Sequence, residues 1–169
     1  MTDDQRNLDD LDSRARPGLY RAAQGQQDIL FVEPYISALR PHWRITTPRA
    51  AYASALALYD CYLRYKAQGD FIGMDMARKF IKLGYTRSRR SAKPSGGQIG
   101  YADRVQTMTH VSPESGEQRI ESARIFFRVW QWVRKDVDYR QLLAEHRRAA
   151  EHRRAYEGLT SSPSFSRGR

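Results

Sequence analysis

Seven Lys and Arg residues, with no Asp or Glu among them, occupy residues 78–93 and are the side chains best suited to chemistry. A guanidinium group presents a planar fork of donors that suits phosphate, and clustered cations can follow a nucleic-acid backbone. The sequence therefore predicts phosphate contacts from six of them: Arg78, Lys82, Arg87, Arg89, Arg90 and Lys93. The alternative is that these charges only complement the dipole of a helix C-terminus, which favours cations by about 0.3–1 kcal/mol each.

Two tyrosines accompany this basic segment. Tyr85 lies within it, and Tyr101 follows the turn at Gly96 and Gly97. An aromatic ring among basic residues can stack on a base of a single strand. Either tyrosine can instead belong to the core, so stacking and packing are both open.

Three residues are candidates for acid–base chemistry: His42, Glu33 and Asp75. His42 is a candidate general base, because histidine often takes this role in proteins, with a structural role as the alternative. Glu33 ends an apolar segment and marks either a salt bridge or a site. Asp75 can pair with Arg78 and Lys79, because residues three and four apart share a face of a helix.

A site for a phosphorylated ligand would need these groups in one place. An enzyme or binding protein for a phosphorylated small molecule or nucleotide would combine the acid–base candidates with arginines. That hypothesis predicts a concave pocket that brings together Tyr20, Arg21, Glu33, Trp43 and Arg78, with Arg44 close by. The sequence predicts no metal site, because the other histidines lack metal-ligand spacing, and it indicates no cofactor.

The overall charge agrees with an anionic partner. The 169 residues carry a net charge of +10, and such an excess usually accompanies a polyanion such as DNA or RNA. A basic protein without that partner is the alternative. Cys61 is the single cysteine, so we expect no internal disulfide and a reducing compartment. We find no membrane span and no secretory signal, so the expected location is the cytoplasm, or the nucleus in a eukaryote.

Helices are expected to position these residues. The sequence predicts a mainly α domain of about four helices, with a short extended or β segment near its N-terminus. Thr47 and Pro48 are typical of a helix start, and Gly69 is typical of a helix end. Asp70 then caps a second helix, whose C-terminal end carries the basic segment. The two helices should form an αα-hairpin.

A long loop and two further helices complete the prediction. Residues 91–117 are rich in Gly, Ser and Pro and are predicted as a loop. Apolar residues then recur at helical spacing from Ile120 to Val133, and an Arg-rich last helix follows a break at Asp136 and Asp138.

The predicted domain boundaries follow composition. A single domain at residues 16–157 lies between a flexible acidic arm at 1–15 and a disordered basic tail at 158–169. Residues 29–32 are apolar and partly β-branched, so they predict a short strand or extended segment, with residues 43–45 as its nearest partner.

Several motifs resemble a known family. They are Val32-Glu33-Pro34-Tyr35, Pro41-His42-Trp43-Arg44, Gly84-Tyr85-Thr86-Arg87-Ser88-Arg89-Arg90 and, most specific, Gly73-Met74-Asp75-Met76-Ala77-Arg78-Lys79-Phe80. Over roughly residues 16–150 the chain resembles the domain of unknown function numbered 4385, which occurs in bacteria, fungi and phages. That resemblance implies one intact domain and implies no activity, since none is assigned to the family.

The chain departs from the family pattern after the paired arginines. The family continues there with an aromatic residue, Ala, Asn, His and Lys, whereas this chain has Ser91-Ala92-Lys93-Pro94-Ser95. The resemblance therefore implies that any chemistry carried by those family residues is absent here.

The leading hypothesis is a sequence-non-specific nucleic-acid-binding protein that contacts phosphates. The first alternative is the phosphorylated-ligand protein described above. The second is a protein–protein interaction module that docks through Trp130, Trp132 and the Arg-rich last helix. The basic segment, without a motif typical of a known reaction, favours a binding protein over an enzyme.

Overall fold

The described part of the chain is helical. The computed structural model describes Tyr20, residues 32–92 and residues 113–160. Their elements are, in order, α1 (Tyr35–Leu39), the 3-10 helix η3 (Arg40–His42), α2 (Pro48–Ala67), α3 (Phe71–Ser91), α4 (Pro113–Lys135) and α5 (Val137–Thr160). No strand occurs in these described residues. The predicted mainly α class is confirmed.

The predicted extended segment lies mostly outside the described residues. Residues 29–31 are not described, and Val32 is not part of a strand. The expected partner, residues 43–45, joins η3 to α2 without regular secondary structure. There Trp43 packs against the core, and the backbone N of Arg44 donates a hydrogen bond of 3.0 Å to Ser54 Oγ on α2.

Capping residues mark the starts of α2 and α3, and a glycine marks the turn between them. Thr47 Oγ1 accepts a hydrogen bond of 3.1 Å from the backbone N of Ala50, which caps α2. Gly69 has a φ of 67°, a conformation that glycine adopts without strain. The Asp70 carboxylate then accepts from the backbone N of Gly73 at 2.9 Å. Since α3 starts directly after this turn, α2 and α3 form the predicted αα-hairpin.

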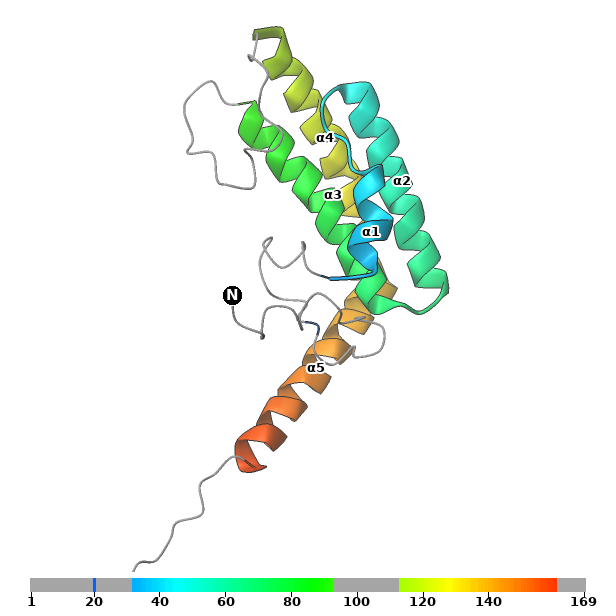
Figure 1. Ribbon diagram of the computed structural model, residues 1–169, viewed down its shortest axis with the longest axis vertical. Coiled ribbons are helices and arrows are strands. Elements are labelled where there is room, and N and C mark those ends of the chain that lie inside the picture. Colours follow the sequence, from blue (N-terminus) through cyan, green and yellow to red (C-terminus); the bar gives the residue numbers. More distant parts are fainter. Residues whose placement is uncertain (1–19, 21–31, 93–112, 161–169) are drawn as a thin grey trace, which may run out of the picture.

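Helix α3 is the centre of the fold. It packs against α2 and α4, and α2 also packs against α4, so these three helices lie side by side (Figure 1). Every residue from Phe71 to Ala77 is buried. Glycine allows a close contact between α3 and α4, because a Cβ at Gly84 would lie 2.6 Å from the ring of Phe126.

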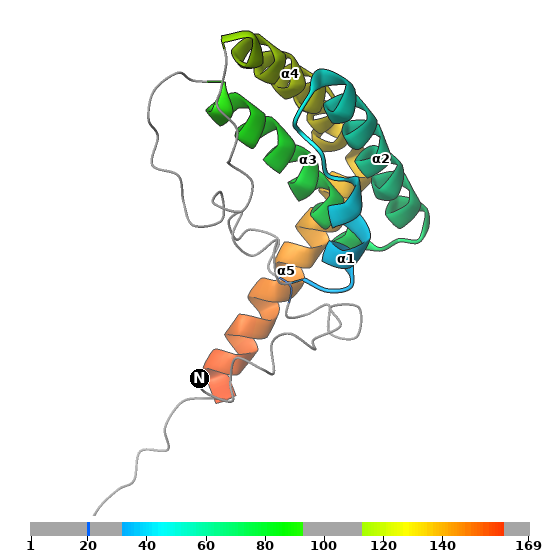
Figure 2. The ribbon, with the colours of Figure 1, turned by 45° about the horizontal axis from the view of Figure 1, so that its top comes forward.

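Helix α5 leaves this bundle. Asp136 alone separates it from α4, and its carboxylate accepts a hydrogen bond of 2.6 Å from the Nζ of Lys66 on α2. The start of α5 packs on the core through buried Tyr139 and half-buried Leu142 and Leu143. Beyond these turns the helix extends away from the other helices (Figure 2).

Two predicted boundaries differ from the structure. Helix α4 begins at Pro113, so residues 113–117 are helical and the loop predicted at 91–117 ends earlier. Ser, Pro and Gly suggested a loop there, yet proline is favoured at the first position of a helix, where its missing N–H is not needed. At the other end, α5 continues to Thr160, beyond the predicted domain end at residue 157.

Candidate functional site

The first half of α3 carries a buried carboxylate surrounded by donors. Asp75 is fully buried, and the Nε and Nη2 atoms of Arg78 each lie 2.8 Å from its Oδ1. Tyr139 donates a hydrogen bond of 2.6 Å to the same oxygen. The Oδ2 atom accepts from Tyr20 at 2.5 Å and lies 3.3 Å from the Nζ of Lys79. We call these five residues the Asp75 cluster.

This cluster joins parts of the chain that are distant in sequence. Lys79 Nζ donates a hydrogen bond of 2.8 Å to the Tyr20 hydroxyl and lies 4.7 Å from the centre of its ring. The Nε2 of His146, on α5, donates to the Tyr20 backbone oxygen at 2.8 Å. The His146 ring also packs on Phe71, with the ring centres 4.9 Å apart. These contacts therefore fasten both Tyr20 and the start of α5 to α3.

Burial and the neighbouring charges together set the charge states in the Asp75 cluster. Burial alone would raise the pKa of Asp75, but the charges of Arg78 and Lys79 and hydrogen bonds from the two tyrosines hold that pKa below its ordinary value. Burial, together with the charge of Asp75, raises the pKa of Tyr20 and of Tyr139. At neutral pH the carboxylate is ionised and both tyrosines are protonated. The buried carboxylate thus has four side-chain partners that link α3 to Tyr20 and α5. An acid–base role for Asp75 stays a prediction.

The second half of α3 presents its cations differently. The Nζ atom of Lys82 lies 5.9 Å from the ring centre of Trp130 on α4. The Cζ atom of Arg87 lies 5.2 Å from the ring centre of Trp43. Both cations are half-buried along these rings, whereas Arg89 and Arg90 are exposed. This half of α3 contains no carboxylate.

Helix α4 adds cations beside this part of α3. A Cβ built at Gly116, near the start of α4, would lie 4.0 Å from the backbone oxygen of Ala92, so these helix ends lie close together. We call residues 82–92 and 116–128 the cationic end. They carry seven cations, Lys82, Arg87, Arg89, Arg90, Arg119, Arg124 and Arg128, and two carboxylates, Glu117 and Glu121.

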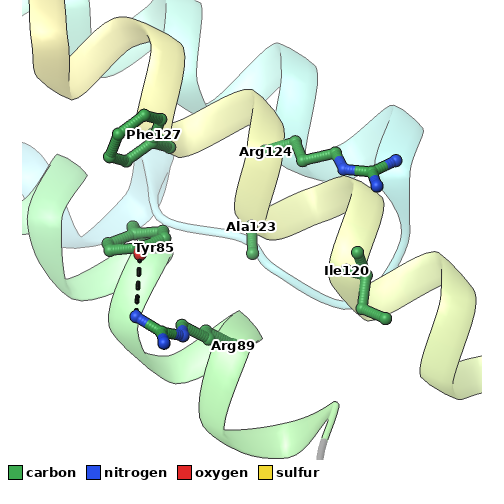
Figure 3. Close-up of a pocket in the computed structure, with 6 residues that line it drawn as sticks. All are labelled: Tyr85, Arg89, Ile120, Ala123, Arg124 and Phe127. Carbon is green, nitrogen blue, oxygen red and sulfur yellow. Dashed lines mark hydrogen bonds between the residues drawn. The ribbon is translucent and has the colours of Figure 1, made fainter.

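A hollow of about 360 Å³ lies between the two helices of the cationic end. Tyr85 and Arg89 line it from α3, and Ile120, Ala123, Arg124 and Phe127 line it from α4 (Figure 3). The lining is mostly apolar, with one arginine from each helix. The Tyr85 hydroxyl accepts a hydrogen bond of 3.1 Å from Arg89 Nη1. Arg124 also lies 3.4 Å from the carboxylate of Glu121, in an exposed pair.

The residues predicted for a phosphorylated-ligand pocket do not share one site. Tyr20 and Arg78 meet in the Asp75 cluster, as described above. Glu33 instead accepts a hydrogen bond of 2.9 Å from the Ser37 hydroxyl on α1. Trp43 lies against Arg87, at the other end of α3, and Arg44 and His42 are exposed.

Three predicted site residues, Arg21, Lys93 and Tyr101, lie outside the described residues. Arg78 is described, and its side chain is 17% exposed because its guanidinium is paired with Asp75. The other predicted phosphate contacts, Lys82, Arg87, Arg89 and Arg90, all belong to the cationic end. Tyr85 lines the hollow, and its stacking role stays a prediction.

The comparisons with known proteins identify the family. The model of a domain of unknown function, DUF4385, matches residues 3–149, which is most of the chain. The chain belongs to the DUF4385 family. No curated protein and no solved structure matches it.

Two further properties of this DUF4385 protein concern metals and membranes. In the part of the chain that the structure describes, no three His, Cys, Asp or Glu side chains are grouped so that they could hold a metal ion. Among the described helices, none is long and apolar enough to cross a membrane.

Sequence reasoning missed several residues of both regions in this DUF4385 protein. Tyr139 joins the Asp75 cluster from α5, and His146 supports Tyr20 from the same helix, yet they lie 64 and 71 residues beyond Asp75 in the sequence. Arg124 and Phe127 complete the hollow from α4. The helical repeat of α4 was visible in the sequence, but the direction of its faces relative to α3 was not.

Proposed function

We propose that the protein binds nucleic acid through phosphate contacts made by the cationic end. One observation carries the proposal: seven cations and only two carboxylates occur in the adjoining segments 82–92 and 116–128. Phosphate contacts of this kind dominate the affinity of most nucleic-acid-binding proteins and carry no sequence information. The proposed binding is therefore indifferent to sequence.

The proposed contacts differ from the set predicted from the sequence. Arg89, Arg90 and Arg124 are exposed and lie on the cationic end, so they are the first candidates for phosphate contacts. Arg78 is left out, because its guanidinium is paired with the buried carboxylate of Asp75. A phosphate contact would require the Arg78 guanidinium to leave Asp75. The buried carboxylate would then lose an ion-pair partner, which is strongly unfavourable.

Binding of a labelled oligonucleotide across a salt series tests the proposal. We expect log K to fall linearly with log salt between about 50 and 200 mM, since each neutralised phosphate releases counterions. Replacing Arg89 and Arg90 with Ala should lower the magnitude of that slope by about 0.7–0.9 for each phosphate that is no longer neutralised. An absence of binding at low salt, or binding that salt does not affect, would overturn the proposal.

A protein-interaction module is a second candidate, favoured by a separate apolar surface. Tyr52, Leu56 and Leu63 on α2 are 58%, 39% and 42% exposed, and Trp132 on α4 is 53% exposed. Half-buried Tyr59 links the two helices, since its ring centre lies 5.6 Å from that of Trp132. Residues 52, 56, 59 and 63 have the alternating spacing of four and three that helix–helix seams use.

We propose that this apolar surface binds the same surface on a second copy of the protein, so that two copies form a dimer. We expect light scattering to give the mass of a dimer, and replacing Leu56 with Glu to return the protein to a monomer. A monomer at every concentration of the unmodified protein would remove this candidate.

A further inference from the structure

The hollow of the cationic end has the character of a small-molecule site as well as that of a basic surface. Its volume of about 360 Å³ lies within the range of about 300–1,000 Å³ that is usual for ligand pockets. Ile120 and Phe127 are 44% and 39% exposed at its edge, although both are large and apolar. Phosphate contacts alone give no reason for such a lining, because phosphate needs donors and not apolar walls.

The aromatic wall of the hollow is held in place. The Tyr85 ring is stacked with Trp130, with centres 5.9 Å apart and planes 15° apart, and it is tilted against Phe127 at 5.2 Å. The hydrogen bond from Arg89 fixes the Tyr85 hydroxyl. A wall that is already ordered loses little conformational entropy when a planar group packs on it.

The charges at the hollow match a planar group that carries phosphate. Arg89 lines the hollow from α3 and Arg124 lines it from α4, and the exposed Arg90 is next in sequence to Arg89. A nucleotide within a strand has an apolar, stackable base and a phosphate on each side of it. An apolar floor flanked by guanidinium groups is complementary to that combination.

Whether a base can enter the hollow depends on whether the nucleic acid is a duplex or a single strand. In a duplex the bases are stacked and paired, so they cannot enter a side pocket unless the helix opens. In a single strand the bases are unpaired and can pack on aromatic side chains. The hollow therefore distinguishes single strands from duplexes, which the phosphate contacts do not.

We propose that the hollow between α3 and α4 binds an unpaired nucleobase, so that the protein prefers single-stranded nucleic acid. This inference rests on the proposed function and adds the part of the strand that is recognised. Tyr85 and Phe127 contact the base, and Arg89 and Arg124 contact the phosphates beside it.

The experiment compares two labelled strands of equal length and equal charge, about 16 nucleotides long. One strand is ordinary single-stranded DNA, and the other has the bases removed in its central part. We expect the unmodified protein to bind the ordinary strand more tightly by about 5- to 150-fold, the equivalent of stacking one base. A duplex with the same number of phosphates, about 8 base pairs long, should show no such gain over the baseless strand.

Replacing Phe127 with Leu should reduce that preference, because the side chain stays apolar but loses its aromatic face. The matched control replaces Tyr156 with Leu, since Tyr156 is an exposed aromatic of α5 that does not line the hollow. Circular dichroism checks that both variants are folded. The control should keep the full preference for the ordinary strand.

The outcomes separate this inference from the proposed function. Equal binding of the ordinary and baseless strands by the unmodified protein, with the salt dependence intact, overturns the base-binding inference and leaves the phosphate contacts standing. Equal loss of preference in both variants also overturns it. An absence of binding to either strand overturns both proposals.

Discussion

The two halves of α3 carry the same kinds of residue in opposite circumstances. In the first half, Arg78 and Lys79 are paired with the buried carboxylate of Asp75. In the second half, the cations lie along aromatic rings or in solvent, and no carboxylate belongs to that stretch. The comparison teaches that a run of basic residues does not define a binding surface. Burial and the presence of a carboxylate decide which cations can meet a ligand.

The neighbours of α3 explain the difference. Tyr20 and the start of α5 cover its first half and bring hydroxyl groups to Asp75. Its second half packs against α4 through Gly84 and Phe126, but beside that contact a hollow remains. One half of the helix is therefore enclosed for stability, and the other is left with cations at an apolar opening.

The largest predicted effect is on the enclosed half. Replacing Asp75 with Ala leaves buried Lys79 and half-buried Arg78 without their carboxylate, which should lower the free energy of unfolding by about 3–5 kcal/mol. Urea denaturation measures this loss. The control replaces Asp60 with Ala, because the ion pair between Asp60 and Arg64 is exposed. It should leave the urea midpoint of unfolding unchanged. Similar losses for the two substitutions would contradict the distinction between the halves.

A smaller loss is expected when one donor to Asp75 is removed. Replacing Tyr139 with Phe keeps the ring and deletes the hydroxyl that lies 2.6 Å from Asp75 Oδ1. A hydrogen bond to a charged group contributes about 1.5–3 kcal/mol, and we expect a loss of that size on denaturation. No loss would mean that the hydroxyl does not support the carboxylate.

The packing of the second half is tested at Gly84. Replacing it with Ala places a Cβ against the fully buried ring of Phe126, so the ring or the helices must shift. Overpacking of this kind lowers stability by about 1–3 kcal/mol, although alanine is otherwise favoured over glycine in helices. Thermal unfolding gives the measurement. A gain in stability would show that the helices are not in close contact there.

The pH dependence of stability tests whether the Asp75 carboxylate is ionised in the folded protein. The pKa of Asp75 is held below its ordinary value, so its carboxylate stabilises the fold above the ordinary aspartate pKa of about 3.9. That contribution is lost as the pH falls through the lowered pKa. We expect replacement of Asp75 with Asn to flatten this part of the stability curve, measured by denaturation at several acidic pH values. The same loss of stability at acidic pH in this variant and in the unmodified protein would contradict an ionised Asp75 carboxylate.

The smallest predicted effect on stability is at the cationic end. Replacing Arg90 with Ala should change the free energy of unfolding by no more than about 0.5 kcal/mol, as is usual for exposed positions. The same denaturation experiment measures it. A loss as large as that at Tyr139 would mean that this arginine is structural.

The sequence predicted the local features of the fold well. The caps at Thr47 and Asp70 and the turn at Gly69 depend on a few adjacent residues, and the structure contains them. The pairing of Asp75 with residues three and four positions later also follows from the helical repeat. The start of α4 was missed because Ser and Pro are common both in loops and at helix starts.

The distant contacts could not be predicted in the same way. Tyr20 and Tyr139 reach Asp75 from 55 and 64 residues away, and no repeat within a helix indicates which distant side chain will meet it. The hollow likewise depends on how α4 is rotated against α3. The sequence showed that residues 78–93 were basic, but it did not show that Arg78 is half-buried against Asp75 or that Arg124 lines the same hollow as Arg89.

The most direct test compares two triple variants that lose the same charge. One replaces Arg89, Arg90 and Arg124 of the cationic end with Ala, and the other replaces exposed Arg147, Arg148 and Arg154 of α5. We predict that the first variant loses affinity for an oligonucleotide and that its salt slope falls by about 2, whereas the second keeps the slope of the unmodified protein. Equal changes in the two variants would show that net charge, and not the cationic end, governs binding.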